Sequence, residues 1–395
     1  MMPRLALTSA VILLAAMLAG AETPAAVAAQ AGRTYWAYVG AESADLIHRL
    51  RFDGATLVVE RTTTIGEIPN EMEGPHGLQT SRDGKFLYMT TGHGRPEGKL
   101  WIFDISGDAD KLVGPTGIDL GMFPASVDVT PDGLYTFSVN FNLHGDMVPS
   151  SVSVVATDEM LEVARIPTCV MPHGSRLNAR GTRHYSACMM DDELVEIDTR
   201  KLAVSRTFLL RKGQERGTTG AMPATAGPGA APAAHDAGGH GMEPPKPGNV
   251  SCSPTWAQPT PDGRRVFVAC NKASEIAEID AESWTLTRRL PAGEGVYNLA
   301  VTHDGRLLVA TNKRGQSVSV FDAGTGRELK RLATKRKVVH GVAITADDRY
   351  AFISVEGIGS EPGTVEVIDL RALATVATVD VGPMAGGIEV MPGPR

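Results

Sequence analysis

Side-chain types that bind soft metals are concentrated in one short stretch, residues 169–198, which reads CVMPHGSRLNARGTRHYSACMMDDELVEID. It holds two Cys, two His and three Met around a segment whose pattern predicts a β-hairpin. Thiolate, thioether and imidazole together favour copper, in either oxidation state. The same residues could instead form a disulfide or do neither, so the strands that position them decide the chemistry.

A repeated hairpin is the strongest signal in the chain. Short apolar runs flank turn residues in SRDGKFLYMTT, TPDGLYTFSVN, NARGTRHYSAC, TPDGRRVFVAC, THDGRLLVATN and TADDRYAFISV. The turn positions are Gly84, Gly133, Gly181, Gly263, Gly305 and Asp348, which lie 49, 48, 82, 42 and 43 residues apart. A second hairpin follows each of these, so each unit has four strands, which is typical of a β-propeller blade.

A seventh unit can be assembled from both ends of the chain. Residues 386–392 supply an innermost strand, and residues 34–64 supply three more. Such closure leaves no open sheet edge in the ring. We therefore predict an all-β fold over residues 33–395: a seven-bladed β-propeller of four-stranded blades, closed by N- and C-terminal strands in one blade.

The segments PDGRRVFVACN, HDGRLLVATN and RDGKFLYMTT, with their VEID and VFD partners, resemble the repeats of bacterial YVTN-type seven-bladed propeller proteins. More distantly, the chain is similar to the propeller domains of nitrous oxide reductase and of cytochrome d1-type haem proteins. The resemblance implies the fold but leaves function open, since such propellers include binding proteins and enzymes. The kinship with haem proteins also suggests a haem d1-like tetrapyrrole as a third candidate ligand.

The N-terminal segment predicts export. MMPR is followed by the apolar run Leu5 to Leu18 and by small residues, so residues 1–21 read as a signal peptide, with cleavage as late as about residue 28. No later stretch is apolar enough to span a membrane. The net charge of −7, without a basic stripe, argues against nucleic acid. We expect a periplasmic or secreted protein whose partner is a metal or small-molecule ligand, with another periplasmic protein as a further candidate partner.

One insertion breaks the repeat. Residues 212–249 are rich in Gly, Ala and Pro, which cannot bury a core, and predict a flexible loop between blades. This loop carries His235, His240 and Met242.

The resemblance to propellers implies that the innermost strand of each blade begins on one face, at the central channel. Alignment of the hairpins gives one equivalent residue at each of these starts: His76, Ala125, His173, Thr255, Tyr297, His340 and Gly386. We predict that His76, His173 and His340 meet at the channel rim and bind a metal ion, with copper the first choice. Possible additional ligands on this face are His93, His144, Cys188, Cys270, Met171, Met189, His235, His240 and Met242. The same alignment predicts Cys188 opposite His173, and Cys270 opposite Thr255.

Structural roles compete with this hypothesis. Cys169 and Cys188, and Cys252 and Cys270, have similar spacings of 19 and 18, which suit two disulfides in an exported protein. In that case the thiolate ligands are lost and the three histidines remain. A bond between Cys188 and Cys270 is a further option. In each His-Gly pair the glycine allows close approach to the axis, and the histidine can hydrogen-bond backbone.

Catalysis has no direct signature here. P-loop, GxSxG, HExxH and CxxCH patterns are absent from the sequence. Asp191 and Asp192 are expected to form a solvated turn. The alternative to a metal protein is therefore a non-catalytic periplasmic binding propeller with two structural disulfides.

Overall fold

The computed structural model describes residues 32–67, 71–93, 97–143, 145–219 and 250–393. The predicted signal peptide lies outside these residues, as do His144, His235, His240 and Met242. Within the described residues, no helix is long and apolar enough to cross a bilayer.

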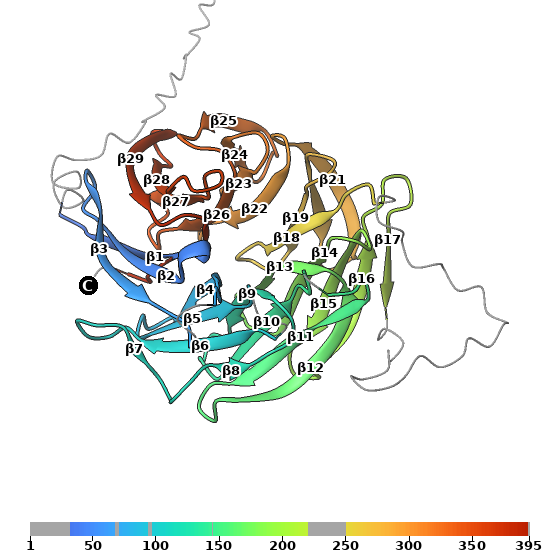
Figure 1. Cartoon of the computed structure of the whole chain (residues 1–395). Coiled ribbons are helices and arrows are strands. Elements are labelled where there is room, and N and C mark those ends of the chain that lie inside the picture. Colours follow the sequence, from blue (N-terminus) through green and yellow to red (C-terminus); the bar gives the residue numbers. More distant parts are fainter. Residues whose placement is uncertain (1–31, 68–70, 94–96, 144, 220–249, 394–395) are drawn as a thin grey trace, which may run out of the picture.

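Seven antiparallel sheets form a closed ring, which confirms the predicted propeller (Figure 1). We number the blades by their innermost strands, which are β4 (Pro75–Thr80), β9 (Pro124–Val129), β13 (Pro172–Leu177), β18 (Pro254–Pro259), β22 (Val296–Val301), β26 (Val339–Ile344) and β30 (Ala385–Val390) for blades 1 to 7. The second strands, in the same order, are β5 (Phe86–Thr91), β10 (Tyr135–Asn140), β14 (Arg183–Cys188), β19 (Arg265–Cys270), β23 (Leu307–Asn312), β27 (Tyr350–Val355) and β1 (Tyr35–Ala41).

The outer strands complete each sheet. The third strands are β6 (Lys99–Asp104), β11 (Pro149–Ala156), β15 (Glu193–Asp198), β20 (Glu275–Asp280), β24 (Ser317–Asp322), β28 (Gly363–Asp369) and β2 (Leu46–Phe52). The outermost strands are β7 (Lys111–Leu112) and β8 (Ile118–Asp119), β12 (Leu161–Val170), β16 (Ala203–Leu209), β21 (Thr285–Pro291), β25 (Glu328–Ala333), β29 (Ala374–Val381) and β3 (Leu57–Thr64). In blade 7, β30 pairs with β1, so strands from both ends of the chain close the ring as predicted.

Apolar layers between neighbouring blades form the core. Between blades 7 and 6, for example, Phe52 meets Tyr350 and Phe352 edge to face, with ring centroids 5.0 and 6.0 Å apart. Each sheet packs on two neighbours, and the middle strands are therefore almost continuously apolar and buried. This rigid ring holds the strand ends that surround the channel.

In blades 1 to 6, the turn between the first two strands lies at the end of the channel that we call lower. It contains the aligned turn residue, which has a positive φ, as in Gly84 (67°) and Asp348 (57°). In blade 4, the Thr260 hydroxyl donates to Asp262 over 2.6 Å, and that carboxylate also accepts from the backbone of Arg264. These local hydrogen bonds define the turn.

The predicted loop, residues 212–249, contains a strand near its beginning. Residues 212–219 are not a loop throughout, because Arg216–Thr219 form β17, a fifth strand on the edge of blade 3 beside β16. The carboxylate of Glu215 accepts from Arg289 of blade 4 over 2.8 Å, which anchors this start. Strand β16 forms the outer edge of the four-stranded sheet, and its unpaired backbone groups can bind β17.

Candidate metal centre at the mouth of the channel

A β-bulge interrupts each innermost strand at its upper end. In blade 3, Pro172 pairs with Cys188 and Ser175 with Ser186, so His173 and Gly174 together face one residue. A bulge bends the strand and redirects its side chains. The predicted pairing of Cys188 with His173 is therefore wrong. Cys270 likewise pairs with Pro254 rather than Thr255.

The bulged residues bring the three predicted histidines together at one rim. The ring of His76 lies 5.8 Å from that of His173 and 5.4 Å from that of His340 between centroids. All three are buried, with 8%, 1% and 4% of their surface exposed. They face a cavity of about 720 Å³ that opens at the channel mouth.

Backbone carbonyls of the next blade orient two of these rings. His76 Nδ1 lies 2.7 Å from the Ala125 carbonyl oxygen, and His173 Nδ1 lies 2.9 Å from that of Thr255. Since a carbonyl only accepts, each Nδ1 carries the proton and each Nε2 keeps its lone pair. This is the arrangement that prepares an imidazole for a metal ion. The glycine that follows allows it, since a Cβ on Gly174 would lie 2.4 Å from the Thr255 oxygen.

Burial keeps these imidazoles neutral. It lowers the pKa of His173 to about 3 and that of His340 well below the usual value. It also lowers the pKa of His76, although the neighbouring Glu42 carboxylate partly opposes this. Neutral imidazole is the form that coordinates metals, so the site needs no deprotonation at neutral pH.

Glu42 is the main site residue that the sequence analysis missed. It begins a short 3₁₀ helix, η1 (Glu42–Ala44), directly after β1, and it is 3% exposed. One carboxylate oxygen lies 2.7 Å from His93 Nε2, and the other lies 3.9 Å from His76 Nε2. Burial acts to raise its pKa, but His76 and His93 outweigh this and lower it. Ligand atoms of Glu42, His76 and His340 all lie within 4.8 Å of one another.

Lys313, Glu356 and Tyr297 form a second polar cluster in the same cavity as Glu42, His76 and His340. Lys313 Nζ lies 2.7 Å from Glu356 Oε1 and 4.3 Å from the ring centroid of Tyr297. The Tyr297 hydroxyl lies 2.9 Å from Nε2 of His173, which therefore already has a partner. Glu42, Lys313 and Glu356 each directly follow the second strand of their blade, and this shared position could have revealed Glu42.

The other predicted imidazole and thioether ligands divide into three groups. His93 is in hydrogen-bond contact with Glu42, and Met189 lines the cavity. Met171 packs behind it, against the cluster of Phe123, Ala125 and Phe141. His144, His235, His240 and Met242 lie outside the described residues.

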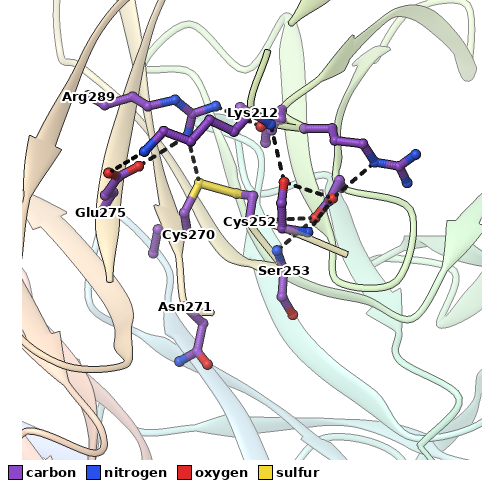
Figure 2. Close-up of a disulfide and its surroundings, with 12 residues drawn as sticks. Lys212, Cys252, Ser253, Cys270, Asn271, Glu275 and Arg289 are labelled. Atoms are coloured by element: carbon purple, nitrogen blue, oxygen red, sulfur yellow. Dashed lines mark hydrogen bonds and ion pairs between the residues drawn. A yellow bond between two sulfur atoms is a disulfide. The ribbon is translucent and has the colours of Figure 1, made fainter. Parts of the chain in front are cut away.

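All four cysteines form disulfides, Cys169–Cys188 and Cys252–Cys270, as predicted. The first joins β12 of blade 2 to β14 of blade 3, and the second lies within blade 4. Figure 2 shows the second, with Arg289 Nη1 3.7 Å from Cys270 Sγ. Cys188 and Cys270 therefore offer no thiolate, and their prediction as metal ligands is wrong.

Asp192 does not lie in a solvated turn, contrary to expectation. It is fully buried, and its carboxylate accepts from the backbone nitrogens of Ser251, Cys252 and Ser253 over 2.7, 3.0 and 2.8 Å. Because a buried carboxylate needs such partners, it fixes the chain where blade 4 begins.

Comparisons with protein-family models and with curated proteins gave no match. Among solved structures, the chain is similar to a functionally unknown protein from Desulfotomaculum acetoxidans, with a TM-score of 0.64 and 15% identity over 91% of this chain and 99% of that one. It is also similar to hydrazine synthase from Kuenenia stuttgartiensis, with a TM-score of 0.57 and 18% identity over 81% of this chain and 91% of that one. At these identities the likeness shows the propeller fold alone. The resemblance to YVTN repeats stays a prediction.

Proposed function

We propose that this chain is an exported β-propeller that binds a transition-metal ion at the mouth of its channel through Glu42, His76 and His340. The observation that carries the proposal is the convergence of three buried ligand atoms within 4.8 Å. Three protein ligands leave coordination positions open toward the cavity. A small molecule can bind there, to be carried, polarised or oxidised.

Copper remains the first choice of metal. Two imidazoles and a carboxylate suit copper(II), zinc or iron(II), and copper(II) binds such sites most tightly. The thioethers of Met189 and Met384 line the same cavity and favour the reduced ion. The role that fits is copper handling or redox chemistry on a bound ligand.

Export is part of the proposal. Two disulfides suit an oxidising compartment, in agreement with the predicted signal peptide.

Metal analysis of the purified full chain tests this function. After loading with copper(II) and removal of excess, we expect one tightly bound ion per chain in the wild type. We expect a loss of at least tenfold in the combined variant Glu42→Gln, His76→Ala, His340→Ala. His184→Phe is the matched control, because His184 is equally buried but lies in blade 3 away from the channel. Unchanged stoichiometry in the combined variant would refute the site, and competition with zinc would test the choice of copper.

A metal-free binding pocket is the second candidate. It is favoured by the contacts of His173 with Tyr297 and of His93 with Glu42, which satisfy these groups without an ion. In that case the melting temperature Tm would be the same with copper, zinc or a chelator. Titration with haem tests whether the chain binds a tetrapyrrole. A haem absorption spectrum that stays unchanged on addition of the protein would exclude this candidate.

A further inference from the structure

The residue two positions before each bulged residue adopts a left-handed conformation in every blade. These rim residues are Gly74, Phe123, Met171, Ser253, Gly295, Val338 and Met384, with φ of 65, 47, 53, 47, 64, 67 and 56°. Hydrogen bonds hold the conformation. The Val338 carbonyl accepts from the backbone of Glu356 over 3.0 Å, and that of Phe123 accepts from Phe141 over 2.8 Å.

Large apolar side chains occupy four of these rim positions, where glycine is the unstrained choice. Positive φ is least favourable for a β-branched residue such as Val338. Outer turns hold Leu202, Trp284 and Leu373 in the same conformation, but those side chains pack into the layers between blades. Val338 and Met384 belong to none of the apolar clusters of the described residues, and both line the cavity. Strain without a packing benefit points to contact with a ligand.

The cavity wall beyond these residues is aromatic. Phe123 and Phe141 meet edge to face with centroids 5.8 Å apart, and Phe141 lies 4.8 Å from the ring of His173. Leu143 and Ile358, which are 41% and 52% exposed, also line the cavity. A volume of about 720 Å³ suits a small organic molecule rather than a bare ion.

The charges on the lining favour an anion once a metal is bound. Among the residues that line the cavity, the two carboxylates Glu42 and Glu356 are outnumbered by the three cations Lys313, Arg314 and Lys337. A divalent ion held by Glu42 offsets the charge of that carboxylate and adds positive charge to the same cavity as Lys313.

We propose that the cavity takes a small aromatic carboxylate, with its carboxylate between the metal and Lys313 and its ring against Phe123, Phe141 and the rim residues Val338 and Met384. An aromatic ring suits this surface because edge-to-face contacts and thioether contacts both favour it. The inference rests on the proposed metal site, which adds positive charge and a coordination position for the carboxylate.

Calorimetric titration of the metal-loaded full chain with benzoate, acetate and benzyl alcohol tests this inference. Benzoate should bind at least tenfold more tightly than either of the others, and at least tenfold more weakly to chelator-treated protein. If acetate binds as tightly as benzoate, the cavity has no binding site for the aromatic ring. If benzyl alcohol binds as tightly as benzoate, the cavity has no binding site for the carboxylate.

The double variant Val338→Gly, Met384→Gly sharpens the test. Glycine adopts the rim conformation without strain, so we expect the fold to be kept while benzoate affinity falls three- to tenfold and acetate affinity stays the same. Leu373→Gly, in an outer turn, is the matched control and should leave benzoate affinity unchanged. Equal benzoate affinity in the double variant and the wild type would overturn the role of the rim.

Metal content is measured first on the same samples, to separate this inference from the proposed function. Absence of metal from the wild type counts against the metal site itself. A metal-loaded protein that does not bind benzoate counts against the aromatic carboxylate alone.

Discussion

The two ends of the innermost hairpin are built by different rules. At the lower end, a Ser or Thr hydroxyl donates to an Asp two residues later in five blades: Ser81–Asp83, Thr130–Asp132, Thr260–Asp262, Thr302–Asp304 and Thr345–Asp347. At the upper end the backbone repeats, with a bulge and a left-handed residue in each blade, but the bulged side chains range from Gly386 to Tyr297 and His340. The fold thus needs repeated side chains below and only a repeated backbone above, which leaves the upper side chains free for chemistry.

The largest effect that we expect is the acid sensitivity of His184, a buried histidine that lies away from the channel mouth. His184 stacks on Phe137, and neither of its buried ring nitrogens has a hydrogen-bond partner. Burial lowers its pKa to about 3, against 6.5 in the unfolded chain. Acidification therefore protonates the unfolded state first. Neutral His184 therefore contributes fully to the unfolding free energy above about pH 6.5. This contribution is lost as the pH falls toward 3, and the total loss is about 5 kcal/mol.

We therefore expect His184→Phe to flatten the dependence of unfolding free energy on pH over this range. At pH 7 the variant should be at least as stable as the wild type, because it removes two unpaired polar atoms. Urea unfolding at a series of pH values, on metal-free protein, measures both effects. Copper stoichiometry should stay unchanged, and a loss of copper would break the division between fold and site.

The disulfides act at the upper end of the ring: one joins blade 2 to blade 3 and the other lies in blade 4. Each closes a loop of about 20 residues, so its removal should cost about 3 kcal/mol. We expect Cys169→Ser, Cys188→Ser to lower the unfolding free energy by this amount, measured by urea unfolding. Copper stoichiometry should be kept, since neither sulfur is a ligand in our proposal. Loss of copper from a folded double variant would reopen a role for these sulfurs.

The same division explains what the sequence could predict. Turns rich in Asp and Gly repeat at the lower end, and alignment on them gave six blades and the positions of His76, His173 and His340. The seventh blade came from the two ends of the chain, and the pairs Cys169–Cys188 and Cys252–Cys270 came from their matching spacings. The bulges have no single residue signature, since Pro172, Val296 and Ala385 all begin bulged strands. The strand pairing of Cys188 was therefore predicted wrongly.

Alignment on the turns alone did not reach Glu42, because blade 7 joins two distant segments and has no hairpin turn between its first two strands. Its position directly after a second strand, as for Lys313 and Glu356, was the remaining signal. Asp192 shows a different limit. Its polar type and its place in a turn predicted exposure, and only the return of the chain after the insertion brings three backbone donors to it. Both residues depend on contacts between parts of the chain that lie far apart in sequence.

The smallest effect tests the lower end directly. Asp262→Ala removes an acceptor of two hydrogen bonds, from Thr260 and from the backbone of Arg264. Because the turn is partly exposed and water can replace these bonds, the unfolding free energy should fall by only about 1 kcal/mol. Asp304→Ala in blade 5 should cost a similar amount, since Asp304 accepts from Thr302 and Arg306 in the same way. Copper stoichiometry and benzoate affinity should match the wild type in both variants. A change in either would mean that the lower turns influence the channel mouth, and that the two ends of the hairpin are not independent.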